Sequence, residues 1–201
     1  MNRNRICKGQ LGYVKSERKA QLIKTCLLFL LPIAIFIMGM LSTGTRKNLL
    51  SVVAILGLLP ASRALVVLIM LYRAKTVGTE LGEMLTELIN AFPEGKRNLA
   101  CECNITTQER NYPVAQLAVM NGCVLGYSDY QDKPGKKKPV DYKKLEDYLK
   151  ECLPNNGYKN YTVKIFTNPD QYKDRILGLS ENAEVSETDE KALLFLLGLS
   201  L

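Results

Sequence analysis

The chain has 201 residues, which is room for one ordinary domain and a short additional segment, so a large multidomain enzyme is excluded. It contains no histidine, which excludes Ser/His/Asp triads, Cys/His catalytic pairs and histidine metal ligands. The net charge of +7 is unevenly distributed, because residues 1–73 carry +10 and residues 74–201 carry −3. The basic character belongs to the N-terminal part, and this distribution does not favour nucleic acid as a partner.

Two apolar segments in the N-terminal part have the length of membrane-spanning helices. The first, at about 22–43, has no charge from Cys26 to Leu41, and the second, at about 49–72, follows a short polar connection. A helix needs about 20 apolar residues to span a bilayer. We therefore predict a basic N-terminal tail over 1–21, then a two-helix transmembrane hairpin in the lipid bilayer. A secretory signal peptide is the alternative for the first segment, but no small-x-small cleavage site follows Met40 and Leu41.

The basic residues near the two segments predict their orientation. Seven Lys and Arg residues precede Cys26, whereas only Arg46 and Lys47 lie in the connection. Because positive charge is retained in the cytoplasm, the N-terminus is expected there, and two crossings return the chain to the same side. The predicted localisation is the cell membrane, as a multi-pass protein with both termini cytoplasmic.

The second apolar segment contains Pro60 and Arg63. Arg63 precedes Tyr72 by nine residues, about 13 Å along a helix. A charged side chain at this depth marks either a functional or partner-binding position, or an arginine that extends toward the head groups beside a proline kink. We favour the second interpretation and keep Arg63 and Pro60 as candidate membrane or partner contacts.

Residues 74–179 have the pattern of a cytoplasmic α/β domain. Apolar spacing predicts an amphipathic helix over 76–92, a strand over 99–105, and strands over 113–120 and 123–127. It further predicts a helix that Asp141 caps and that runs to Leu153, a strand over 161–167 and a short helix from Pro169. Asn121-Gly122 between the second and third strands is a strong signal for a β-hairpin. Residues 180–190 are expected to form an acidic linker, followed by an apolar helix over 192–201 that packs on the domain or against the membrane.

The predicted order αβββαβα is compatible with a small α/β sandwich and coincides with the order of restriction-endonuclease-like cores. Nucleases of that architecture need carboxylates on the second and third strands to hold a divalent cation. The corresponding strands here carry Ala115, Gln116, Leu125 and Gly126 instead. We therefore predict no catalytic residues and no cofactor.

The six cysteines do not have the spacing of a disulfide framework. Cys101 and Cys103 are expected on one face of a strand, where Cys123 and Cys152 could join them in a zinc site. The C-x-C spacing is less specific than paired C-x-x-C motifs, so buried reduced thiols are the preferred interpretation.

These observations lead to three hypotheses about function. The first is a membrane-anchored cytoplasmic module that acts by binding, with a protein partner or a second copy of the chain as its ligand. The second is a membrane-associated, divalent-cation-dependent nuclease-like enzyme. The third is a small transport or sensing accessory subunit in which Arg63 pairs with an acidic group of a partner.

Overall fold

The computed structural model describes residues 6–44, 49–93, 97–130, 140–180 and 185–200. The chain divides into two compact units, Val14–Ala74 and the combination of Met1–Tyr13 with Lys75–Leu201. Arg46 and Lys47, on which the predicted orientation depends, lie outside the described residues.

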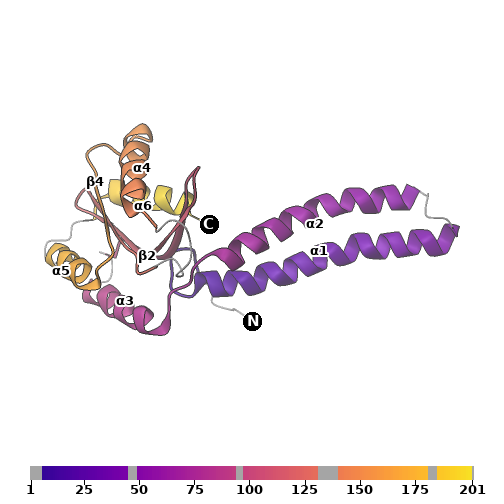
Figure 1. The fold of residues 1–201 in the computed structure, drawn as a ribbon, viewed down its shortest axis with the longest axis horizontal. Helices are drawn as coiled ribbons and strands as arrows, with labels where there is room; N and C mark the ends of the chain where they lie inside the picture. The colour runs from indigo at the N-terminus through magenta and orange to yellow at the C-terminus, as the bar shows by residue number, and fades with distance from the viewer. Residues whose placement is uncertain (1–5, 45–48, 94–96, 131–139, 181–184, 201) are drawn as a thin grey trace. The chain divides into compact units, whose positions relative to one another are not determined.

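The first unit is a pair of long helices. Helix α1 spans Tyr13–Thr43 and helix α2 spans Leu49–Arg73, and they run side by side (Figure 1). Both are long and apolar enough to cross a membrane. Helix α1 begins nine residues earlier than expected, so the second half of the predicted N-terminal tail is helical. The preceding residues belong to the α/β unit instead.

Small and polar side chains form the contact between these two helices. The buried positions are Val14, Gln21, Thr25, Pro32 and Gly39 on α1, and Ser51, Ala54, Ala61, Ala64 and Leu71 on α2. On α1 these positions recur at intervals of four and seven, the spacing that keeps one face of a helix toward a partner helix. A Cβ atom at Gly57 would lie 3.3 Å from Cβ of Pro32, so glycine allows the helices to approach closely.

The α/β unit is built on a four-stranded mixed sheet in the order β1-β2-β3-β4. The strands are β1 (Leu99–Thr106), β2 (Asn111–Met120), β3 (Cys123–Tyr127) and β4 (Thr162–Phe166); the helices are α3 (Thr79–Ala91), α4 (Tyr142–Asn155), α5 (Pro169–Ser180) and α6 (Glu187–Gly198). Strands β1 to β3 are antiparallel, and β4 is parallel to β3. The predicted element order is therefore confirmed as an α+β arrangement.

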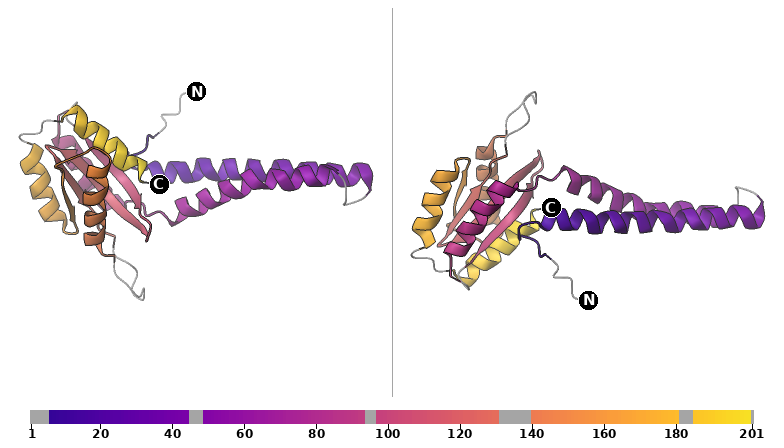
Figure 2. Two further views of the ribbon diagram at one scale, coloured as in Figure 1. Left: turned by 90° about the horizontal axis from the view of Figure 1, so that it is seen from above. Right: turned by 90° about the horizontal axis from the view of Figure 1, so that it is seen from below.

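Helices cover both faces of the sheet (Figure 2). Leu145, Leu149 and Leu153 of α4 pack with α6 on one face. On the other face, α3 and α5 contribute Leu85, Leu88, Tyr172 and Ile176, and Phe92 directly follows α3. The sheet lies between two apolar layers, and this explains why nearly all residues of β2 are buried.

Several features predicted from short sequence signals are confirmed. Asn121 and Gly122 have φ of 50° and 66°, as the predicted hairpin turn requires. The Asp141 side chain caps α4 by accepting a hydrogen bond from the Lys143 amide, and α5 begins at Pro169.

The expected acidic linker over 180–190 is partly wrong, because α6 already begins at Glu187. Ser186 and Asp189 form a capping box, in which each side chain bonds the other residue's backbone amide. Acidic residues in this first turn are also favoured by the helix dipole. Ala192, Leu193 and Leu196 are buried against the sheet, so α6 packs on the domain.

At both edges of the sheet, backbone amides of the edge strand donate hydrogen bonds to groups outside the sheet. At β1, the Cys101 amide donates to the Gly9 carbonyl at 2.6 Å, and the Thr106 amide donates to the Leu199 carbonyl at 3.0 Å. At β4, the Ile165 amide donates to Oε1 of Glu146 at 2.8 Å. These contacts occupy groups that would otherwise pair with another strand.

Candidate functional site

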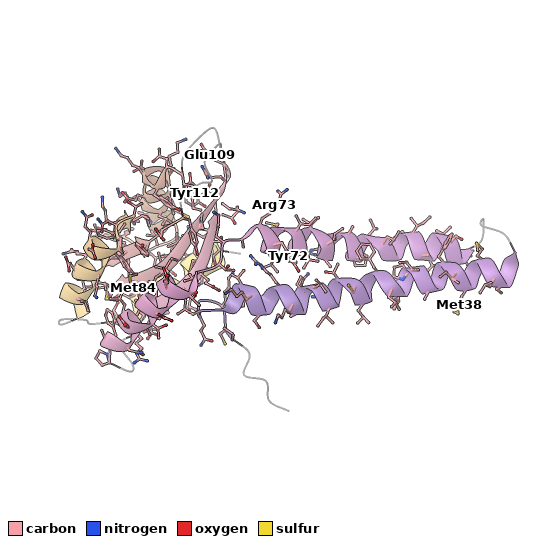
Figure 3. All side chains as sticks on the ribbon, turned by 60° about the horizontal axis from the view of Figure 1, so that its bottom comes forward. Met38, Tyr72, Arg73, Met84, Glu109 and Tyr112 are labelled. Carbon is pink, nitrogen blue, oxygen red and sulfur yellow. The ribbon has the colours of Figure 1, made fainter. Side chains whose placement is uncertain are left out.

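The described part of the α/β unit contains an open groove of about 580 Å³. One wall is the β1–β2 turn with Thr107, Gln108 and Glu109, together with Tyr112. The other wall is one face of α4, with Lys144, Asp147, Tyr148, Glu151, Cys152 and Asn155. Figure 3 shows Glu109 and Tyr112 at this end of the sheet.

The packing of α4 determines which side chains line the groove. Leu145, Leu149 and Leu153 are fully buried against the sheet. The lining residues of α4 recur at intervals of three and four along an adjacent face, so they form one continuous row. The turn opposite is held by Thr107, which donates its amide to the Arg110 carbonyl at 3.0 Å and accepts from the Arg110 amide through Oγ1 at 3.3 Å.

The groove carries more negative than positive charge. Its carboxylates are Glu109, Asp147 and Glu151, and its one cation among the lining residues is Lys144. Nζ of Lys144 lies 3.2 Å from Oε2 of Glu109, and this hydrogen bond raises the pKa of Lys144. Asp147 and Glu151 are exposed, and Oδ1 of Asp147 lies 3.9 Å from Nζ of Lys150. Glu151 is therefore the carboxylate of the groove best placed to meet a ligand that brings positive charge.

Tyr148 and Cys152 are less polar side chains that also line the groove. Partial burial raises the pKa of Tyr148, and its hydrogen bond with Cys152 acts in the same direction. The raised pKa of Tyr148 is the opposite of the depressed pKa that marks an activated nucleophile.

The four candidate zinc ligands do not come together. Glu102, between Cys101 and Cys103, has φ of 53°, which interrupts the two-residue alternation of a strand. Cys103 therefore packs in the α4/α6 core, whereas Sγ of Cys101 accepts a hydrogen bond from Gln116, which itself bonds Tyr172 of α5. The expectation that both cysteines share one face is wrong.

The remaining two cysteines lie elsewhere. Cys123 begins β3 and packs against the α3/α5 core, and Cys152 lines the groove on α4. Within the residues that the structure describes, no group of three or more Cys, Asp or Glu side chains could hold a metal ion. All six cysteines are described, and none forms a disulfide.

Pro60 and Arg63 both lie on the exposed surface of α2, which continues through Pro60 without a break. In the described part of the helix pair, the buried polar side chains are Gln21, Thr25 and Ser51, which the sequence did not single out. Nε2 of Gln21 donates to the Ala64 carbonyl at 3.2 Å. Oγ1 of Thr25 donates to the Gln21 carbonyl at 2.7 Å and shares this proton with the Ala64 carbonyl at 3.4 Å. Gln21 follows Val14 by seven residues, and Pro32 follows Thr25 by seven. This spacing was the signal that could have identified Gln21 and Thr25 in the sequence.

Arg18 was also missed as a structural residue. Its guanidinium donates to the Leu71 carbonyl at 2.9 Å and the Ala74 carbonyl at 2.6 Å, and it lies 5.6 Å from the centre of the Tyr72 ring. These carbonyls are at the end of α2, where a helix leaves them without an internal partner. Arg18 therefore caps α2 and ties the two helices together.

Comparison with protein-family models, with curated proteins and with solved structures gives no match to this chain. The class of protein is thus defined by the chain itself, as an apolar helical hairpin joined to an α+β domain with a mixed sheet.

Proposed function

We propose that the chain is a membrane-anchored module in which α1 and α2 span the cell membrane and the α/β unit binds a partner in the cytoplasm. The observation that carries the proposal is the surface of the helix pair. Only 17% of the most apolar window in each helix is buried, whereas the core helix of a soluble protein is mostly buried. Large apolar side chains cover the outer surface; Met38 is one that points outward in Figure 3. Such a surface is stable in lipid and not in water.

The excess of Lys and Arg before Cys26 supports a cytoplasmic position for both termini and for the α/β unit. The partners in this proposal are the bilayer and a protein, either a second copy or another chain, that carries positive charge into the groove. Nucleic acid fits poorly, because it would bring negative charge to Asp147 and Glu151.

The enzyme alternative receives less support. The element order coincides with that of restriction-endonuclease-like cores. However, Ala115 and Gln116 of β2 and Leu125 and Gly126 of β3 are all buried. Of the nearest carboxylates, Glu102 accepts a hydrogen bond from the Val77 amide, and Glu109 is paired with Lys144. We propose that the likeness is limited to the order of the elements.

The anchor can be tested with single tryptophans, because the chain contains none. Leu30 on α1 and Leu194 on α6 are similarly exposed, at 64% and 67%. In vesicles that contain lipids brominated near the middle of their acyl chains, we expect strong fluorescence quenching for Leu30→Trp and none for Leu194→Trp. Equal quenching of the two variants, or none for Leu30→Trp, would contradict the anchor.

The binding role of the groove can be tested by charge reversal. For the full chain in nanodiscs of zwitterionic lipid, we expect Glu151→Lys to weaken binding of a fluorescent oligolysine peptide by about tenfold, or about 1.4 kcal/mol. Asp174→Lys on α5 makes the same charge change on an exposed residue outside the groove and should leave the affinity unchanged. Equal weakening by both variants would show that the peptide responds to net charge and not to the groove.

A further inference from the structure

Two cations of the helix pair lie at the same height. The bonds from Gln21 and Thr25 to the Ala64 carbonyl place Ala64 opposite this stretch of α1. Lys24 directly precedes Thr25, and Arg63 directly precedes Ala64, and both cations are exposed. Their Cα atoms are therefore within about one helical turn of each other along the hairpin.

Lys24 and Arg63 also lie on the same side of the pair. Thr25 and Ala64 face each other, and each preceding residue is rotated by about 100° around its helix. Because the helices are antiparallel, the two rotations have opposite sense in a common view, and both cations turn to the same side. Lys19 is about 140° around α1 from Lys24, which places it on the other side.

The height of the two cations matches the edge of a bilayer. From Lys24 to Thr43, α1 is about 28 Å long at about 1.5 Å per residue, close to the hydrocarbon thickness of about 30 Å. With the far end of the hairpin at one boundary, Lys24 and Arg63 reach the other, so the membrane-spanning part of α2 ends near Arg63 and not at Tyr72 as the sequence suggested. This is the level of lipid phosphates.

Exposed apolar side chains continue from the two cations toward the far end of the hairpin. On the same side, one and two turns further, α1 carries Leu27 and Leu31, which are 68% and 60% exposed. Leu56 on α2, 59% exposed, lies on this side as well. The two cations match the phosphate of a phospholipid, and the apolar side chains beyond them match its acyl chain.

We propose that Lys24 and Arg63 bind the phosphate of one anionic phospholipid in the cytoplasmic leaflet, with an acyl chain along Leu27, Leu31 and Leu56. This inference rests on the proposed membrane anchor. It gives Arg63 a lipid partner in place of an acidic group of another protein. Arg18 does not join the site, because its guanidinium is bonded to the end of α2.

Native mass spectrometry of the full chain from nanodiscs with equal amounts of phosphatidylglycerol and phosphatidylcholine tests the proposal. We expect preferential retention of one phosphatidylglycerol, reduced about fivefold by Lys24→Gln or Arg63→Gln and abolished by the double variant. Lys19→Gln, the matched control on the other side, and Arg63→Lys should retain it. Millimolar inorganic phosphate should not displace the lipid, since free phosphate lacks the acyl chain.

A wild-type chain without lipid preference, equal loss in Lys19→Gln, or displacement by inorganic phosphate would overturn the proposal. Measuring the fluorescence quenching of Leu30→Trp in the Lys24→Gln/Arg63→Gln background distinguishes failure of the lipid site from failure of the membrane anchor. If Leu30→Trp remains quenched while lipid retention shows no dependence on Lys24 and Arg63, the anchor stands and the lipid site does not.

Discussion

The α/β unit is expected to lose stability steeply as the pH rises from about 8.5 to 10. Burial raises the pKa of both Cys101 and Cys103 to about 12, although a hydrogen bond from Gln116 partly opposes the shift at Cys101. In the unfolded chain a cysteine has a pKa of about 8.5. Between these values the folded state keeps a proton that the unfolded state releases, so the free energy of unfolding falls with pH, by roughly 1.4 kcal/mol per unit for each thiol. At pH 10 the loss is on the order of 2 kcal/mol per thiol.

Urea unfolding of the full chain in detergent micelles, followed by circular dichroism from pH 7 to 10, measures this effect. The variant Cys101→Ala/Cys103→Ala removes both thiols and should show a flatter pH dependence, whatever its stability at pH 7. Replacing the exposed Cys7 and Cys26 by Ala should leave the steep dependence intact. Parallel pH curves for the wild type and the Cys101/Cys103 variant would show that these thiols do not control alkaline unfolding.

Leu149→Ala is expected to destabilise the α/β unit by about 2–5 kcal/mol. Leu149 is the central apolar residue of α4, is fully buried and packs in the cluster that joins α4, α6 and the sheet. Truncation removes apolar contacts and leaves a cavity, because the sheet and helix cannot close around it completely. The same loss would displace the α4 wall of the groove.

Leu194→Ala is the matched control, since Leu194 lies on α6 and is 67% exposed. Its effect should be within about 0.5 kcal/mol, as for most surface positions. Thermal unfolding of both variants in the same detergent compares them directly. Similar losses for Leu149→Ala and Leu194→Ala would be inconsistent with the packing of α4 described above.

Local chemistry was sufficient to predict most of the elements. Asn121-Gly122 accommodates the positive φ values of a tight hairpin, Asp141 supplies an N-terminal cap, and Pro169 suits the first turn of a helix. The long apolar runs around Pro32 and Pro60 likewise identified two helices. In each case the deciding interaction lies within a few residues of the chain, so the amino-acid sequence alone determines it.

Features that depend on contacts between distant residues required the tertiary structure. The backbone at Glu102, with its side chain bonded to Val77, turns Cys101 and Cys103 to different layers, although the sequence alternates as in a regular strand. A non-glycine residue with positive φ costs about 1–3 kcal/mol and persists only where surrounding contacts compensate for it, which no local pattern reports.

The candidate sites also depend on contacts between residues that are distant in the sequence. The groove joins the β1–β2 turn to α4, more than 30 residues apart, and Lys24 and Arg63 reach one height only because Ala64 is bonded to Gln21 and Thr25. The sequence by itself determined the helices, the strands and the positive charge of the N-terminal part. Which side chains share a surface was decided by tertiary packing, because the register between two elements depends on side chains from both.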